Sequence, residues 1–128
     1  MKTKVAIIDD HELVRSSLCN CLTIWGYDVI IQACSGRDFL NQVEDNNLPD
    51  ICITDIKMPE LNGLEIIKII RRTWPSIKIV IHSMNVVVGN RDMLIAVDGV
   101  ISKSDDVSYL KAILQQFSND IPESTYAS

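Results

Sequence analysis

The sequence has 128 residues, of which 47% are hydrophobic and 23% charged, ordinary values for one globular domain with a buried core. Its formal net charge of −5 argues against this segment binding a nucleic-acid backbone by itself, because such binding needs a concentrated basic face. No run approaches the ~18 apolar residues of a membrane-spanning helix, and the first apolar run is too short for a signal peptide, so we expect a cytoplasmic protein.

Short apolar runs alternate with segments of helical period in the first part of the chain, which is the pattern of βαβ units. Gly26 ends the first helical segment. Ser35 is placed to cap the second one by accepting a hydrogen bond from the backbone N–H of Asp38. The predicted elements are a strand at residues 4–8, a helix at about 13–24, a strand at 27–33 and a helix up to about 44.

The same alternation continues to the end of the chain, where Trp74-Pro75-Ser76 breaks a helix and Ser104 is a candidate N-cap of the last one. The predicted elements are strands at 50–54, 77–82 and 99–102, and helices at about 64–73, near 90–97 and at 106–117. Five strands in strict alternation with helices predict an α/β fold: a doubly wound, five-stranded parallel sheet in a single domain at residues 1–120.

Polar residues follow the carboxyl ends of four predicted strands: Asp9 and Asp10, Asp55, Ser83, and Lys103. These ends meet at one edge of an open α/β sheet, which is where ligands bind. Two carboxylates about 4 Å apart repel by roughly 1–4 kcal/mol, so three of them favour a bound cation. Oxygen ligands suit Mg²⁺. The pattern therefore predicts a site for a divalent cation and a phosphoryl group.

The cysteines and histidines give no clear sign of a second site. The four cysteines lack C-x-x-C spacing, and two histidines offer few partners for zinc. We interpret the cysteines as reduced thiols of a cytoplasmic protein, with a structural or redox role as the open alternative. They are Cys19, Cys21, Cys34 and Cys52.

The most specific features, taken in chain order, are Asp9-Asp10, the D-x-x-M-P-x-x-x-G segment at residues 55–63, Ser83 and Lys103. Together they resemble the receiver domains of two-component response regulators, over residues 4 to about 117. The resemblance implies a flavodoxin-like sheet of strand order 2-1-3-4-5. A finer similarity, in Asp9-Asp10-His11 and the Trp74-Pro75-Ser76 turn, is to the LuxR/NarL subclass, whose output domain is a helix-turn-helix.

For the phosphoryl group, the resemblance implies that Asp55 is the phosphoacceptor and that a sensor histidine kinase or a histidine phosphotransfer domain is the donor. Lys103 would neutralise the phosphoryl oxygens as a point charge. Ser83 would donate a hydrogen bond to them. The protein would take part in its own phosphotransfer and dephosphorylation without being a classical enzyme.

For the metal, the resemblance implies Mg²⁺ as the cofactor. Asp10 and Asp55 would be direct ligands, Asp9 would act through water, and the backbone carbonyl of Lys57 would be the third protein ligand. Before the resemblance is considered, Asp9-Asp10 has a plainer interpretation, in which it ends a strand and caps the first helix.

The implied result is a phosphorylation-controlled switch, because a phosphoryl group adds charge and hydrogen-bond acceptors that reshape a protein-binding surface. That surface would serve an output domain or a homodimer contact. DNA would be bound only through a separate output domain. Residues 121–128 would then be a C-terminal tail or the start of a linker to that domain. The cognate kinase, the regulated genes and the dimer face are not indicated by the sequence.

Three residues depart from the receiver pattern. Val100 stands where an inward-turning aromatic is common, so the way the signal leaves the site is open. Met84 stands where alanine is usual, and we expect its bulk to slow small phosphodonors such as acetyl phosphate. His82 occupies an inner strand position, as a satisfied core histidine or, alternatively, a pH sensor.

Two other functions remain open. An aspartate-nucleophile phosphohydrolase would also use a carboxylate, Mg²⁺ and a lysine, but such enzymes carry a D-x-D pattern at the first strand, and this chain has adjacent aspartates there. The other is a receiver-like interaction module that works without phosphorylation, which the departures at Met84 and Val100 favour.

Overall fold

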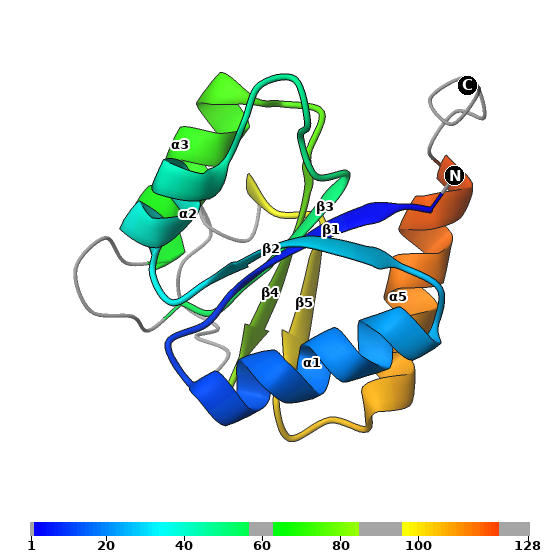
Figure 1. The fold of residues 1–128 in the computed structure, drawn as a ribbon. Helices are drawn as coiled ribbons and strands as arrows, with labels where there is room; N and C mark the ends of the chain where they lie inside the picture. Colours follow the sequence, from blue (N-terminus) through cyan, green and yellow to red (C-terminus); the bar gives the residue numbers. More distant parts are fainter. Residues whose placement is uncertain (1, 57–62, 85–95, 121–128) are drawn as a thin grey trace.

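The computed structural model describes residues 2–56, 63–84 and 96–120, and in them a five-stranded parallel sheet lies between two pairs of helices (Figure 1). The strands are β1 (Lys4–Ile8), β2 (Asp28–Ala33), β3 (Ile51–Thr54), β4 (Lys78–Ser83) and β5 (Gly99–Ser102). The helices are α1 (Glu12–Ile24), α2 (Gly36–Gln42), α3 (Gly63–Thr73) and α5 (Val107–Asp120). The strand order is β2-β1-β3-β4-β5, which confirms the predicted fold.

All four strand pairs are parallel, so every strand ends at the same edge of the sheet. The central strand β3 is buried along its whole length, as expected for a strand that helices cover on both faces. Residues that alternate along one strand enter different cores: Ala6 and Ile8 face α2 and α3, whereas Val5 and Ile7 face α1 and α5.

Two apolar cores hold the helices to the sheet. On one face α3 contributes Ile66, Ile67 and Ile70, all fully buried. On the other face α1 contributes Leu18 and Leu22, and α5 contributes its own leucines and a phenylalanine. A fully buried side chain of this size stabilises the fold by roughly 1.5–3 kcal/mol relative to exposure. These layers fix the sheet edge as a rigid platform.

The predicted ends of the first two helices are largely confirmed. Gly26 adopts a φ of 93°, a left-handed conformation that glycine reaches without steric cost, and it ends α1. The Ser35 hydroxyl accepts a hydrogen bond from the Asp38 N–H at 3.0 Å, as predicted. Helix α2 ends at Gln42 and not at about residue 44, because Val43 leaves the helical conformation with a ψ of 137°.

The predicted cap of the last helix was wrong. Asp106 accepts from the Ser108 N–H at 3.0 Å, so it occupies the capping role that the sequence assigned to Ser104. The Ser104 N–H donates to the Ser102 hydroxyl at 3.2 Å and so belongs to the turn before the helix. The helix itself runs to Asp120, beyond the predicted end at about residue 117.

An arginine clamp ties α3 to the two last strands at the edge opposite the site. The Arg71 guanidinium donates to the Ala96 carbonyl at 2.9 Å and pairs with the Asp98 carboxylate at 2.8 Å. The same Asp98 oxygen accepts from the Ile79 N–H of β4 at 2.8 Å. One guanidinium therefore joins α3, β4 and the segment that leads into β5.

Parts of the prediction lie outside the described residues. They are most of the weaker helix expected near residues 90–97, the Lys57 carbonyl, and the tail at residues 121–128.

Candidate functional site

The polar residues that end four strands lie along the carboxyl edge of the sheet. Backbone hydrogen bonds continue the ladders beyond the strands: the Asp55 N–H donates to the Ile8 carbonyl at 3.0 Å, and the Lys103 N–H to the Ser83 carbonyl at 2.9 Å. The Asp9 N–H likewise donates to the carbonyl of Ala33, the last residue of β2, at 3.0 Å. Asp9, Asp55 and Ser83 are buried. The strand ladders thus align the residues that the sequence pattern placed at this edge.

Lys103 joins two of the strand ends directly. Its Nζ lies 2.8 Å from an Asp9 carboxylate oxygen and 2.7 Å from an Asp55 oxygen. The lysine side chain is only 7% exposed, so water screens these contacts weakly. Burial alone would lower the pKa of Lys103, but hydrogen bonds to Asp55 and Asp9 outweigh it, and the pKa is raised. The ammonium therefore stays charged between the two carboxylates.

The Asp55 carboxylate is held at both oxygens. One oxygen receives the Lys103 ammonium, and the other accepts the Ile56 N–H at 2.6 Å. The Thr54 hydroxyl donates to the Asp55 backbone carbonyl at 2.9 Å, which fixes the main chain at the same point. A carboxylate oriented in this way is a suitable nucleophile, because its geometry is set before a substrate arrives.

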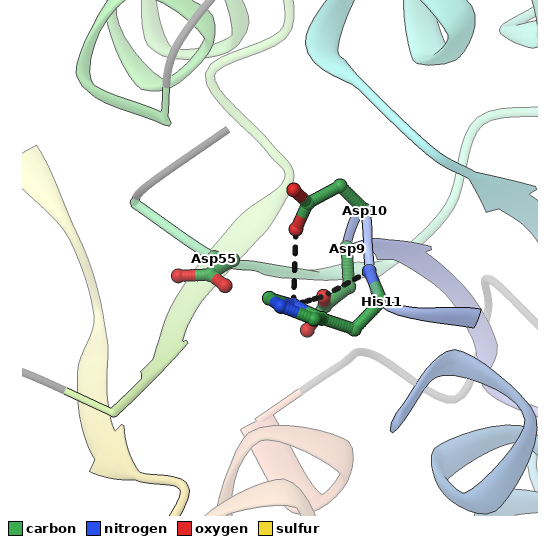
Figure 2. A group of neighbouring side chains, drawn as sticks. All are labelled: Asp9, Asp10, His11 and Asp55. Atoms are coloured by element: carbon green, nitrogen blue, oxygen red, sulfur yellow. Dashed lines mark hydrogen bonds and ion pairs between the residues drawn. The ribbon is translucent and has the colours of Figure 1, made fainter. Parts of the chain in front are cut away.

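A second set of contacts involves His11, in the loop after β1, and Arg15, in α1, neither of which the sequence analysis assigned to the site; Figure 2 shows His11 beside the two aspartates that follow β1. The His11 ring nitrogen Nδ1 lies 3.2 Å from an Asp9 oxygen and 3.1 Å from an Asp10 oxygen. The backbone N–H of His11 donates to the same Asp9 oxygen at 2.9 Å. The Arg15 guanidinium donates to the Asp9 backbone carbonyl at 2.7 Å.

Three aspartates and His11 form a group that could hold a metal ion. Asp9, Asp10, His11 and Asp55 each offer one ligand atom, and these atoms all lie within 4.8 Å of one another. Figure 2 shows their side chains gathered from the loop after β1 and the end of β3. The three carboxylates and Lys103 sum to a formal charge of −2, which a divalent cation would balance. The three carboxylates therefore fit the hard, oxygen-ligated cation that the sequence predicted.

A pocket of about 440 Å³ adjoins the site between α1 and the start of α5. Its walls are mainly apolar side chains such as Val14 and Leu110, and Lys103 lines it on the side of the carboxylates. Met84 also lines this pocket and is 63% exposed. Its side chain thus stands in solvent beside the site, where bulk can obstruct an approaching molecule.

His82 lies on β4 and faces the same pocket. The ring is half-buried, and its Nδ1 is buried without a hydrogen-bond partner among the residues that the structure describes. Burial first, and the charge of Lys103 second, lower the pKa of His82. The interpretation of His82 as a satisfied core histidine was therefore wrong, because the ring lines the pocket instead of the core and its buried nitrogen has no partner among the described residues.

Comparison with known proteins identifies the family. The sequence matches the response regulator receiver domain over residues 5–115. The chain belongs to this family. Among the described residues, no helix is both long and apolar enough to span a membrane.

Curated relatives agree with this assignment. Response regulator GacA of Pseudomonas aeruginosa is 39% identical over 79 residues, which cover 61% of this chain and 36% of GacA. Transcriptional regulatory protein DegU of Brevibacillus brevis is 31% identical over 85 residues, which cover 66% of this chain and 36% of DegU. Chemotaxis protein CheY of Thermotoga maritima is 37% identical over 83 residues, 65% of this chain and 68% of CheY. The chain thus spans about a third of the length of GacA and DegU.

Solved structures agree as well. The response regulator TrrA of Thermotoga maritima, crystallised in complex with Mg²⁺ and a beryllium fluoride, superimposes with a TM-score of 0.81. It is 27% identical in sequence, and the match covers 91% of this chain and 99% of TrrA.

Proposed function

We propose that this receiver accepts a phosphoryl group on Asp55 from a sensor histidine kinase or a histidine phosphotransfer domain. The observation that carries the proposal is the position of Lys103, whose ammonium lies 2.7 Å from the Asp55 carboxylate and 2.8 Å from Asp9. A donor and an acceptor that are both anionic need such fixed positive charge to approach each other.

In the proposed transfer, an Asp55 carboxylate oxygen forms a bond to phosphorus while the bond between phosphorus and the donor's histidine nitrogen breaks. The electron pair of the broken bond returns to the imidazole. The Lys103 ammonium then contacts the phosphoryl oxygens and gives up part of its contact with the Asp55 carboxylate. The Ser83 hydroxyl donates a hydrogen bond to the same group. The Ile56 N–H keeps the second Asp55 oxygen in place.

Mg²⁺ is the proposed cofactor, with Asp10, Asp55 and the backbone carbonyl of Lys57 as direct protein ligands and Asp9 acting through water. The three aspartates belong to the group whose ligand atoms lie within 4.8 Å of one another. The TrrA complex with Mg²⁺ supports the choice of ion, since its fold matches this chain over 91% of the residues. When bound, the ion neutralises carboxylate and phosphoryl charge.

The proposed output is a changed protein-interaction surface that controls transcription through a separate DNA-binding domain, with a homodimer contact as one form of that surface. DegU supports this, because it is named a transcriptional regulatory protein and is about three times as long as the matched segment, which covers 36% of it. We propose that residues 1–120 form the receiver and that 121–128 begin a tail or linker. Four free cysteines agree with a cytoplasmic location.

The experiment is intact-mass analysis after incubation with Mg²⁺ and a phosphorylated histidine-kinase domain. A gain of about 80 Da, the mass of one phosphoryl group, is expected in the wild type and not in Asp55→Asn. Asp28→Asn is the matched control, because Asp28 is exposed at the far end of β2. Labelling that survives in Asp55→Asn would show that another residue is the acceptor.

A second candidate function is a receiver-like interaction module that works without phosphorylation. The observations that favour it are Val100, which packs against the core on the α2 and α3 face in place of an aromatic switch, and the exposed Met84 beside the site. Absence of any mass gain with several competent kinases, in a protein that still binds its partner, would favour this alternative.

A further inference from the structure

His11 takes no part in the proposed phosphotransfer, yet its imidazole lies among the carboxylates. Its Nδ1 is 3.2 Å from an Asp9 oxygen and 3.1 Å from an Asp10 oxygen. The side chain is 65% exposed, so the ring reaches this position from the solvent side and can adjust without disturbing the core. It is also the first residue before α1 and makes no side-chain capping hydrogen bond to that helix.

These separations match those between neighbouring ligands on one ion. With metal–ligand bonds of about 2.1 Å, adjacent octahedral ligands stand about 3.0 Å apart. Tetrahedral ligands at about 2.05 Å stand about 3.3 Å apart. The two distances at His11, 3.2 and 3.1 Å, fall between these values. The ring nitrogen is therefore spaced from the Asp10 oxygen, a direct ligand in the proposed site, as two ligands of one cation are spaced, and all the ligand atoms of the group lie within 4.8 Å of one another.

A single hydrogen bond accounts for the contact of the ring nitrogen with Asp9 but not for its contact with Asp10. The Nδ1 atom carries at most one proton, and two carboxylate oxygens at 3.2 and 3.1 Å would have to share it. A cation in place of the proton would contact the ring nitrogen and the Asp10 oxygen at once, with Asp9 acting through water as in the proposed site.

We propose that His11 is a nitrogen ligand of the divalent ion, and that it makes this receiver bind borderline transition ions such as Co²⁺ and Zn²⁺ selectively over Mg²⁺. The inference rests on the proposed metal site and adds a specificity-determining residue to it. Carboxylate and water ligands suit Mg²⁺, whereas imidazole suits transition metals. Any oxygen site already favours Co²⁺ over Mg²⁺ to some degree, so the decisive quantity is how far selectivity depends on the ring.

The test measures Co²⁺ and Mg²⁺ affinity by calorimetry, at one fixed pH, for the wild-type chain and His11→Asn. Both proteins carry Cys34→Ser, which removes the one exposed thiol of the four cysteines. Asparagine keeps a polar group at the helix start. We expect His11→Asn to weaken Co²⁺ binding about tenfold or more and Mg²⁺ binding less than about twofold.

The histidine ring signals give a direct second measurement, because the chain contains only two histidines. In nitrogen-edited NMR spectra, Zn²⁺ should shift the Nδ1 resonance of His11 strongly and that of His82 little. Equal weakening of Co²⁺ and Mg²⁺ in His11→Asn, or a His11 resonance that Zn²⁺ leaves in place, would overturn the inference. Mg²⁺ binding and phosphorylation would then still stand on their own. Conversely, His11-dependent Co²⁺ binding in a protein that never becomes phosphorylated would support the inference and refute the proposed function.

Discussion

Replacing Lys103 with methionine removes the ammonium while keeping most of the side-chain length, so it isolates the charge that Asp9 and Asp55 share. At the 2.7 Å separation from Asp55, unit charges attract by ~6 kcal/mol at an effective dielectric constant of 20. Desolvation of the three groups offsets much of that attraction. The variant leaves two carboxylates, whose side chains are 2% and 5% exposed, without their cation. We expect a loss of about 3–5 kcal/mol in the free energy of unfolding without metal.

The assay is urea unfolding of Lys103→Met, the wild type and a control, Lys68→Met, which removes an exposed lysine from α3. The control should change stability by less than about 0.5 kcal/mol. Added Mg²⁺ should stabilise Lys103→Met more than the wild type, because the ion supplies the positive charge that methionine lacks. A loss below about 1 kcal/mol, or a loss equal to that of the control, would refute the assignment of Lys103 as the cation that holds both carboxylates.

The pH dependence follows from the raised pKa of Lys103. Its stabilising contribution is fully present below the unfolded value of 10.5 and is lost only as the pH rises through the higher folded value. The stability difference between the wild type and Lys103→Met should therefore stay level between roughly pH 7 and 9. A difference that shrinks across this window would mean that Lys103 loses its proton there, contrary to the direction of the shift.

Three further predictions test other parts of the molecule. Arg71→Ala should lose about 1–3 kcal/mol of unfolding free energy, because it removes charged hydrogen bonds to the partly buried Ala96 carbonyl and to the Asp98 carboxylate. The exposed neighbour Arg72→Ala should lose under about 0.5 kcal/mol, and equal losses in urea titrations would contradict the clamp. Met84→Ala should speed phosphorylation by acetyl phosphate about threefold to tenfold, a change of ~0.7–1.4 kcal/mol in the activation barrier, because it removes a bulky side chain beside the site. An unchanged rate in intact-mass time courses would exclude obstruction by Met84. Burial raises the pKa of Cys52 to about 12, so its thiol is protonated and unreactive at neutral pH. Iodoacetamide should therefore label the exposed Cys34 and leave Cys52 unmodified until the protein unfolds. Early labelling of Cys52 would show that β3 opens locally.

The positions of the polar residues at the carboxyl edge could be predicted from the sequence, because the ends of the short apolar runs mark the ends of the strands. Parallel crossover connections then place the polar residue that follows each strand at the same edge of the sheet. Asp9, Asp55, Ser83 and Lys103 are then aligned by backbone ladders, which depend little on the side chains themselves. Nothing but the order of strands and helices was needed to bring these residues together.

The contacts that escaped prediction are made by side chains whose partners depend on three-dimensional packing. Arg15 reaches back six residues to the Asp9 carbonyl, and Arg71 reaches Asp98 across 27 residues. A sequence shows that arginine is present but not which carbonyl comes within reach. The prediction of the N-cap of α5 was wrong for a different reason. Ser104 and Asp106 are both good capping residues two positions apart, and the local sequence pattern does not distinguish between them.

Of the three residues that depart from the receiver pattern, Val100 lies apart from the groups that would do the chemistry, whereas Met84 and His82 line the pocket beside them. Val100 packs into the core on the α2 and α3 face, whereas Lys103, three residues later, has already left β5 and points its ammonium at Asp9 and Asp55. A change at Val100 can therefore alter how the sheet couples to its helices without moving the acceptor. In the proposed function, phosphate acceptance would depend on the backbone ladders and buried charges at the carboxyl edge, and output on packing at the α2 and α3 face. A receiver built this way can keep the first function while the second diverges, and phosphorylation without an aromatic rotamer switch is then physically consistent.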